Sequence, residues 1–331
     1  MSAQRRSLKA LVAGWQDEGH LQAFTVYLNY VRSFDHLICS HYGDGEEVDF
    51  AALADAIRST PSFGPNLRRE RSAELYEKHL KNAWFTEVAL NIPDIFTLPE
   101  LVPYFNHWAT VMAYYVVHHG MRAAIAVRGG QPTMTRSHQS LLNQAGAYLA
   151  NSRVFPVPWN VVCIGHEGDH QYACRPDDAT SECRSLLKRF EAEDAWPFFC
   201  KALATTRDRA IGERIDQWKQ QQHRTRIRRS LRCTIGQAVQ PTTFLNFLLR
   251  LRLRSNYLDS DAFAAALTRE GDAADFNRSI RNIVAGSMMV CETLITAMAG
   301  DSDIRRIAEW TTSRIEGAQM TVGRRMPYWS E

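Results

Sequence analysis

The sequence predicts an all-α fold: a helical bundle with an N-terminal helical extension and an inserted, partly irregular basic segment. Apolar residues recur at spacings of three and four through most of the chain, as on the buried side of amphipathic helices. Long alternation of apolar and polar residues, which is typical of strands, is missing from the sequence. With 331 residues, 45% of them hydrophobic and 23% charged, the chain is long and apolar enough to bury a sizeable core.

Residues 1–96 are expected to form an N-terminal helical region. One side of its first helix carries Leu21, Phe24, Leu28, Val31 and Ile38. A short second helix from Phe50 to Arg58 begins after Asp49, whose carboxylate suits the free backbone N–H groups of a first helical turn. A third helix is expected from about Leu67 to Leu90. Pro93, Pro99 and Pro103 then mark a connection.

Residues 97–150 and 241–300 are expected to form the bundle. Thr97-Leu-Pro-Glu100 has the form of a capping box and predicts a helix that runs, after an adjustment at Pro103, to Val127. Gly129-Gly130 and Pro132 end it. The remaining pattern predicts helices from about Arg136 to Ala150, from Pro241 to Tyr257, from Ser260 to Arg269, from Ala273 to Ala299 and, within a C-terminal helix and tail at 301–331, from Ile304 to Ile315.

Residues 151–240 are expected to be an insertion between bundle helices. From Phe155-Pro-Val-Pro158 to about Pro176 the sequence has no helical periodicity, and helical patterning returns from Ser181 to Arg232. This segment combines an irregular stretch, a close grouping of cysteines and histidines, and much of the basic charge. We therefore expect a binding site in this part of the chain.

The sequence favours a cytoplasmic protein without a membrane span. The apolar run from Leu11 to Trp15 is too short for a secretory signal, and no small-residue cleavage site follows it. The longest apolar stretch, Trp108 to Val117, is about half of the ~20 residues that cross a bilayer. Seven scattered cysteines in a chain of this length are typical of reduced thiols.

Basic charge is concentrated between Arg207 and Arg254. This stretch holds twelve Lys or Arg and three acids, a local charge of +9, so that the rest of the chain carries −6 of the net +3. Guanidinium groups at this density bind phosphates through paired hydrogen bonds. The predicted nucleic-acid-binding residues are Arg224, Arg226, Arg228, Arg229, Arg232, Arg250, Arg252 and Arg254.

These arginines are expected to form two helical rows. Arg224, Arg228 and Arg232 would share one side of a helix, Arg250 and Arg254 one side of the next, and the two rows would line one groove. Aromatic residues nearby are few, which favours contact with the phosphate backbone over stacking on bases. Two alternatives stay open: a solvated face paired with acids such as those at 191–194, and a surface that docks on an acidic protein partner.

Four segments together resemble the HEPN domain, a small helical bundle of prokaryotic toxin and antiviral systems. They are His107-Trp-Ala-Thr-Val-Met-Ala-Tyr-Tyr-Val-Val-His118, Thr135-Arg-Ser-His-Gln-Ser-Leu-Leu142, Leu251-Arg-Leu-Arg-Ser-Asn-Tyr257 and the helix Phe276 to Met298. The third is similar to the family's Arg-x-x-(small)-Asp-Tyr signature, with Asn256 in place of aspartate. Tyr114, Tyr115 and Tyr257 are equally consistent with an ordinary bundle core.

The resemblance implies RNA binding, in a defence or toxin–antitoxin system, by a homodimer or with a protein partner. The ribonucleases of the family pair an Arg with a His, with four to six residues between the two. None of the eleven histidines here has an arginine at that distance before it. We therefore expect a binding or scaffolding role, without the family's nuclease residues, more than an enzyme.

A cysteine and histidine grouping in the insertion suggests a metal site. Cys163-x2-His166-x3-His170-x3-Cys174 offers the four ligands of a tetrahedral Zn²⁺ site, which would give the irregular stretch a reason to fold. The same stretch contains the HExxH pattern of zinc hydrolases, with Glu167 as the base that activates water. Gly168 and Asp169 favour a turn over the helix on which that pattern resides, so ordinary loop residues are a further interpretation.

Overall fold

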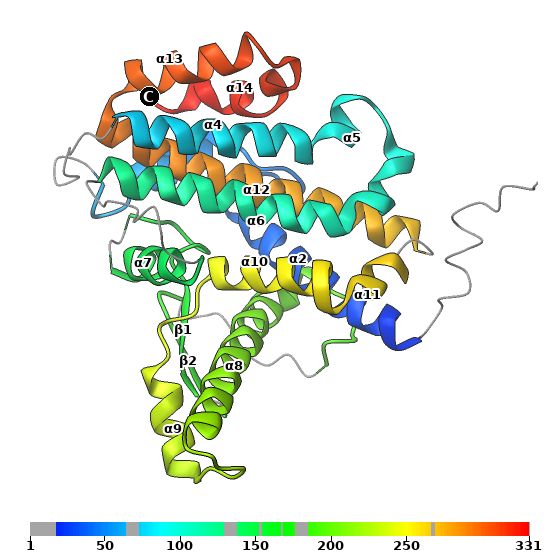
Figure 1. The fold of residues 1–331 in the computed structure, drawn as a ribbon. Coiled ribbons are helices and arrows are strands. Elements are labelled where there is room, and N and C mark those ends of the chain that lie inside the picture. Colours follow the sequence, from blue (N-terminus) through cyan, green and yellow to red (C-terminus); the bar gives the residue numbers. More distant parts are fainter. Residues whose placement is uncertain are drawn as a thin grey trace, which may run out of the picture.

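The computed structural model describes residues 18–63, 73–128, 138–151, 154–166, 168–175, 185–265 and 269–330, and within them the chain is an all-α bundle with one small sheet (Figure 1). The helices of the first half are α2 (Glu18–His41), α3 (Phe50–Arg58), α4 (Ala73–Leu90), α5 (Ile92–Ile95), α6 (Val102–Val127) and α7 (His138–Asn151). Strands β1 (Val162–His166) and β2 (Asp169–Ala173) follow. The helices of the second half are α8 (Ala195–Gln221), α9 (Arg229–Ala238), α10 (Phe244–Leu253), α11 (Ser260–Ala265), α12 (Glu270–Ala299), α13 (Asp301–Thr312) and α14 (Val322–Arg325).

Helices α4, α6 and α12 lie along one another in the middle of the molecule, with α13 and α14 on one side and α2, α7 and α10 on the other (Figure 1). Their facing sides supply one continuous hydrophobic core, which also takes in the beginning of α8. Helix α12 is long and apolar enough to cross a membrane, but 83% of that stretch is buried among the other helices, as in the core helix of a bundle. Packing against neighbouring helices accounts for its composition.

The predicted N-terminal helices are confirmed where the structure describes them. Helix α3 spans Phe50–Arg58 as expected, and the Asp49 carboxylate accepts hydrogen bonds from the backbone nitrogens of Ala51 and Ala52 at 2.8 and 3.2 Å. Helix α4 ends at Leu90 as expected, whereas its expected start lies outside the described residues. The apolar side of α2 is buried in the core except at Leu21, which is half-buried.

The predicted capping box at Thr97 does not form. Thr97 has a positive φ of 53°, and Leu98 precedes a 3₁₀ turn without a side-chain cap. Proline occupies the first turn both of this 3₁₀ segment and of α6, so fewer backbone N–H groups need a cap there. Helix α6 nevertheless ends at Val127 as predicted. The capping box appears instead at Thr243, reciprocated by Asn246 at the start of α10.

The insertion differs most from the sequence-based prediction. Its irregular part contains the antiparallel hairpin β1–β2, in which Gly165 pairs with His170. Gly165 has a φ of 87° and lies so close to the Asp169 carbonyl that a Cβ atom would clash. The helical patterning predicted from Ser181 to Arg232 falls, within the described residues, on two helices, α8 and α9, and His223 with a φ of 50° lies in the turn between them.

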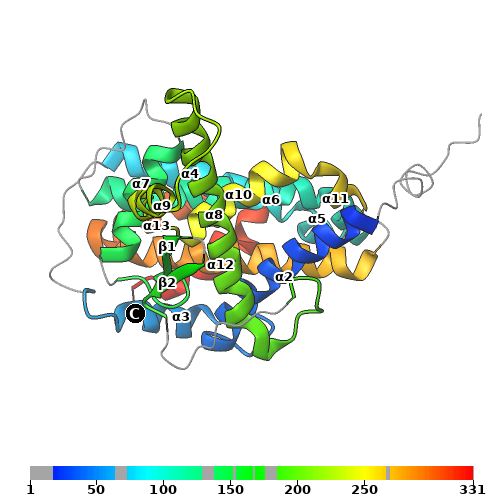
Figure 2. The same ribbon diagram turned by 90° about the horizontal axis from the view of Figure 1, so that it is seen from below.

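The far half of α8, α9 and the hairpin together project from the bundle and are called the arm below (Figure 1). Seen from below, α8 lies across the underside of the bundle, with β1, β2 and α9 beside it (Figure 2). Inside the arm, β1 packs against both α8 and α9. The sequence predicted an inserted segment here; the structure makes it a projection with its own shape.

Candidate functional site

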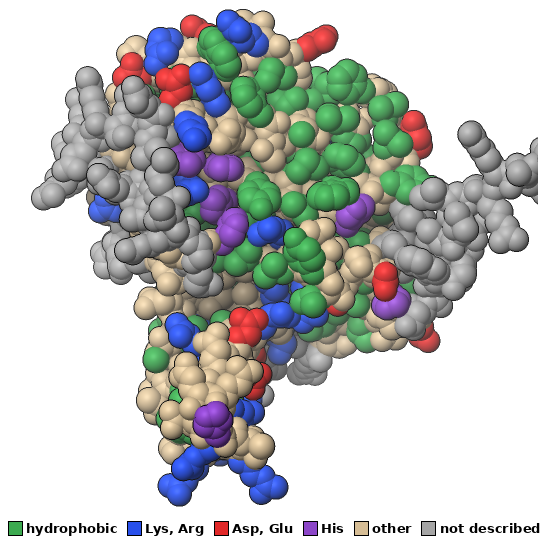
Figure 3. All heavy atoms as spheres, in the orientation of Figure 1, with side chains coloured by type: hydrophobic (Ala, Val, Ile, Leu, Met, Phe, Trp, Pro, Cys, Tyr) green, Lys and Arg blue, Asp and Glu red, His purple; other side chains and the backbone are tan. Residues whose placement is uncertain are grey.

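The tip of the arm carries four exposed arginines. Arg224, Arg226 and Arg228 lie in the turn between α8 and α9, and Arg229 is the first residue of α9. Basic side chains are visible at this end of the molecule in Figure 3. The predicted row of Arg224, Arg228 and Arg232 on one helix side is wrong, because α8 ends at Gln221 and the chain turns before α9 begins.

The other predicted row lies on the bundle and faces the protein. Arg250 donates hydrogen bonds to the hydroxyls of Thr205 and Thr206 at 2.6 and 3.2 Å. Arg254 begins a π-helix, Arg254–Leu258, and pairs with Asp259 at 3.2 Å. Since the tip and α10 lie at different places in the fold, the predicted groove between the two rows does not form (Figure 1).

The arginines of the tip have no carboxylate partner in the described part of the chain. The acids at 191–194, which we considered as partners, pair instead with Lys188, whose Nζ lies 3.5 Å from Glu191 and 2.8 Å from Asp194. Arg224, Arg226, Arg228 and Arg229 make no ion pair with any described acid. Their charge is therefore directed at solvent.

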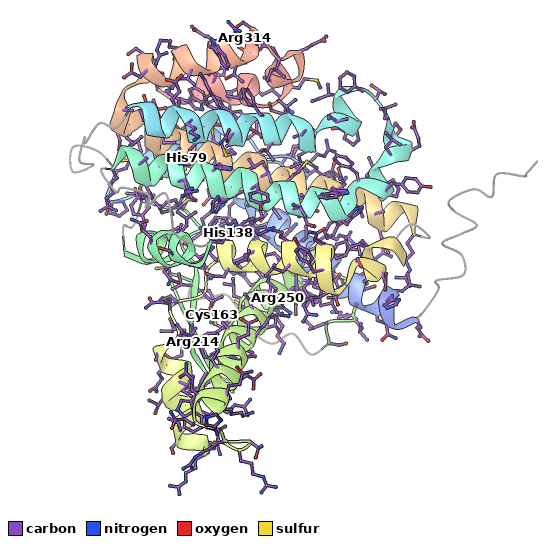
Figure 4. All side chains as sticks on the ribbon, in the orientation of Figure 1. His79, His138, Cys163, Arg214, Arg250 and Arg314 are labelled. Carbon is purple, nitrogen blue, oxygen red and sulfur yellow. The ribbon has the colours of Figure 1, made fainter. Side chains whose placement is uncertain are left out.

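Two pockets flank α9 on the arm. One lies between α8 and α9 and is lined by Arg214, Trp218 and Ile235, with Arg214 labelled in Figure 4. The other lies against the hairpin and is lined by His166, Ile211, Ile227, Arg229, Arg232 and Cys233. The first places an arginine beside a half-buried indole. Such a pair suits a flat, anionic ligand such as a nucleotide.

Arg207 holds the base of the arm together. Its guanidinium is 1% exposed and donates to the carbonyl oxygens of Gly165 at 2.8 Å, Gln240 at 2.8 Å and Gly236 at 2.9 Å, with further bonds to those of Cys163 and Val239. Burial lowers the pKa of Arg207 from its ordinary value. One side chain thus ties α8 to the hairpin, to α9 and to the strand-like segment before α10.

The predicted zinc ligands lie on the hairpin but do not converge. Cys163 and His170 share one side of the hairpin and His166 points to the other, while Cys174 lies beyond β2 with a positive φ of 60°. His170 is hydrogen-bonded to Asp208 at 2.9 Å, and burial raises the pKa of the Cys163 thiol to about 12. No group of three or more metal-ligating side chains occurs among the described residues. The HExxH stretch is a strand and turn, not a helix. Glu167, the proposed base, lies outside the described residues.

A cluster of histidines that we did not predict lies on the bundle. His79 comes from α4, His118 and His119 from α6, and His138 from the start of α7. The Nδ1 atoms of His79 and His119 are 3.3 Å apart, and the rings of His118 and His138 have centroids 5.2 Å apart. Figure 3 shows histidines grouped on this face, and Figure 4 labels His79 and His138.

Two tyrosines and two arginines complete this histidine cluster. The Tyr114 hydroxyl is 3.0 Å from His138 Nδ1. The Arg252 guanidinium lies 4.8 Å from the centre of the Tyr115 ring and 5.4 Å from that of Tyr114. Arg122, one turn after His118, faces the same histidines and lowers their pKa values. Neither arginine makes an ion pair within the described residues.

Every histidine of the cluster is held in its neutral form. Burial lowers the pKa of His79 to about 4, of His118 to about 3 and of His119 to about 4, and it lowers that of His138 as well. The charges of Arg122 and neighbouring histidines act in the same direction, as do those of Lys78 on His79 and of Arg252 on His138. Among the described residues, no acid is a cause that raises these pKa values.

Part of the histidine cluster could have been found in the sequence. His118, His119 and Arg122 lie close together on one predicted helix, which is a signal that the sequence contains. His79 could not be included, because only the packing of α4 on α6 brings it to His119 across 40 residues of sequence.

The segments that resemble the HEPN domain lie next to one another. Helix α6 packs against α7, α10, the π-helix and α12. Tyr114 is buried, while Tyr257 on the π-helix is 65% exposed and is not a core residue. Comparison of the chain with protein-family models, with curated proteins and with solved structures gives no match. The geometry of the arm and of the histidine cluster is therefore the basis for a function.

Proposed function

We propose that this protein binds nucleic acid, with RNA preferred over DNA, through contacts between the tip of the arm and the phosphate backbone. One observation carries the proposal: four exposed arginines at the end of a projecting arm, without acidic partners among the described residues. In keeping with the resemblance, we further propose a HEPN-like, cytoplasmic protein of a prokaryotic defence or toxin–antitoxin system.

The chemistry of the tip supports this proposal. A nucleic acid releases counterions when arginines neutralise its phosphates, and this release gives affinity without sequence preference. Projection from the bundle lets a strand pass on several sides of the tip without a clash. The nearby pocket with Arg214 and Trp218 offers a surface on which one base could stack.

A charge-matched pair of variants tests the proposal. The first replaces Arg224, Arg226, Arg228 and Arg229 by alanine. The control removes four other exposed arginines, on or next to α12, α13 and α14: Arg278, Arg306, Arg314 and Arg324. Both lose the same charge. Fluorescence anisotropy with a labelled single-stranded RNA and with DNA of the same sequence, over a range of salt concentrations, measures binding.

We expect the tip variant to lose affinity by roughly tenfold or more at low salt. The slope of log K against log salt should fall in magnitude by about three, because each of the four lost phosphate contacts on a single strand contributes ~0.7. The control should bind as the unaltered protein does. Absence of binding at low salt, or equal binding by both variants, would refute the proposal. Capture of an acidic protein by the tip in its place would assign the surface to a protein partner.

A further inference from the structure

We propose that the histidine cluster, formed by His79, His118, His119 and His138 with Arg122 and Arg252, is a binding site for a phosphate group, and that it takes up a proton when the phosphate binds. This site is separate from the tip of the arm. It lies on α4, α6, α7 and α10, which belong to the bundle.

The first argument is the sign of the charge. The groups that face the histidines are Lys78 and Arg122, with Arg252 from α10, and all three are cationic. The connection from α6 to α7 at 129–137 also contains no Asp or Glu in its sequence. Cationic groups that lack a countercharge attract an anion, and the gain is largest where the site is partly desolvated.

The second argument is the state of the donors. Arg252 is held by the faces of Tyr114 and Tyr115 and not by a carboxylate, so that its N–H groups are not engaged by an acid. His118 is only 6% exposed, and its Nδ1 atom is buried without a hydrogen-bond partner, as are the Nε atoms of Arg122 and Arg252. Buried polar atoms without partners are costly, and a bound anion would accept hydrogen bonds from those that carry a proton.

The third argument concerns the proton. His79 and His119 bring two Nδ1 atoms within 3.3 Å, a contact in which one ring must donate and the other accept, so two imidazolium rings cannot share it. Burial and cationic repulsion together keep the rings neutral, and an anion between the histidines and the arginines would offset the repulsion. A histidine that then accepts a proton becomes a further donor to the anion.

The chemistry of the donors selects phosphate. Two guanidinium groups and several imidazoles present more donors than the two oxygens of a carboxylate can accept, whereas a phosphate has three or four acceptor oxygens and close to two charges near pH 7. A transition metal also binds neutral imidazoles, but among the described residues no three His, Cys, Asp or Glu side chains are placed so that together they could hold a metal ion. The bound phosphate could belong to a free nucleotide, or it could be the terminal phosphate of a nucleic-acid strand.

Isothermal titration calorimetry with inorganic phosphate is the primary test. Titrations at pH 6.5 in two buffers of different ionisation enthalpy report the number of protons taken up. We expect saturable binding, net proton uptake at pH 6.5, and affinity that weakens as the pH rises from 6 to 8. Binding without proton uptake, or no saturable binding at millimolar phosphate, would overturn the proposal.

Variants locate the site. Arg252→Gln should weaken phosphate binding by about tenfold or more, the range for losing a charge-assisted hydrogen bond. His138→Gln, a half-buried residue at the start of α7, is a second variant and should reduce proton uptake. Circular dichroism checks that both fold. Unchanged binding in both folded variants would rule out this site.

The arm variant separates this proposal from the proposed function. With Arg224, Arg226, Arg228 and Arg229 replaced by alanine, phosphate binding should be unchanged even if RNA binding is lost. Conversely, Arg252→Gln should leave the salt dependence of RNA binding unchanged. Competition by a nucleoside monophosphate and by a 5′-phosphorylated oligonucleotide, each compared with inorganic phosphate, identifies which source of phosphate fits. Loss of phosphate binding in the arm variant would contradict the proposal.

Discussion

At the scale of single residues, a buried ionic group fixes the chain's last helices to the bundle. Arg325 is 1% exposed and donates to Glu87 at 2.5 and 2.7 Å and to Glu292 at 2.8 and 2.9 Å. Trp84 and Trp329 also donate to Glu292. Burial would lower the pKa of Arg325, but the two carboxylates raise it above its ordinary value, and Arg325 stays charged.

Removal of the cation should destabilise the whole protein. Arg325→Met leaves two buried carboxylates without a counterion, and we expect the free energy of unfolding to fall by about 3–5 kcal/mol. Tryptophan fluorescence during urea unfolding measures this change. Its neighbour Arg324 is 60% exposed, so Arg324→Met is the matched control and should change stability by less than about 0.5 kcal/mol. Similar unfolding midpoints for the two variants would contradict the assigned role.

At the scale of secondary structure, the predictions succeeded where a local signal fixes an element. Helix α3 has a capping aspartate and a short apolar side, and its predicted bounds match those observed. The turn after α8 was missed because Arg224 to Arg232 continue a plausible helical spacing, while the backbone reverses at His223. The hairpin was missed because each strand is five residues long, too short for alternation to be recognised.

The two candidate sites could be predicted from the sequence to different degrees, because only one of them consists of residues close together in the sequence. Charge density along the chain located the arginines of the tip, because they are close in sequence. The chain between Gln221 and Arg229, however, decided which way they point. The histidine cluster depends on contacts between α4, α6, α7 and α10 that span up to 173 residues, from His79 to Arg252, so no local pattern contains it.

Arg207 makes the arm a cooperative unit, and its replacement should loosen the arm before the bundle. Arg207→Leu removes the guanidinium hydrogen bonds to the carbonyl oxygens of Gly165, Gly236 and Gln240. We expect faster amide hydrogen exchange in β1, β2 and α9, with protection of α4, α6 and α12 retained. RNA affinity should fall because the tip loses its fixed position.

A neighbouring arginine provides the control for this experiment. Arg209 lies on the same helix and pairs with Glu213 at 3.0 Å in a partly exposed position, so Arg209→Leu should leave exchange in the arm unchanged. If Arg207→Leu raised exchange equally across the bundle and the arm, Arg207 would support the whole fold. Unchanged exchange in β1 would remove its role altogether.

At the scale of the whole molecule, the protein has two cationic surfaces, and the rest of the chain carries a net negative charge. The segment from Arg207 to Arg254 carries +9 and the rest −6. The tip directs its share into solvent on a projection, while Arg122 and Arg252 carry their charge beside the neutral histidines on the bundle. A long anionic polymer and a single phosphate are thus suited to different parts of one chain.

The histidine cluster should make the stability of the whole protein depend on pH. An unfolded histidine has a pKa near 6.5, whereas the folded values are about 4 for His79, 3 for His118 and 4 for His119. Between these values the unfolded chain binds more protons than the folded one. Stability due to these groups is therefore fully present above pH 6.5 and is lost as the pH falls toward 3, by up to about 1.4 kcal/mol per pH unit for each histidine.

Urea unfolding at pH 7.5, 6.5, 5.5 and 4.5 measures this dependence, and His119→Gln should reduce its slope between pH 6 and 5 by about 1.4 kcal/mol per pH unit. The exposed His223 on the arm provides the control, since His223→Gln should leave the slope unchanged. Phosphate that binds the cluster should stabilise the fold more at pH 5.5 than at pH 7.5, because the histidine cluster takes up a proton when phosphate is bound. An equal slope for His119→Gln and the unaltered protein would mean that the acidic side chains, and not this cluster, set the pH dependence.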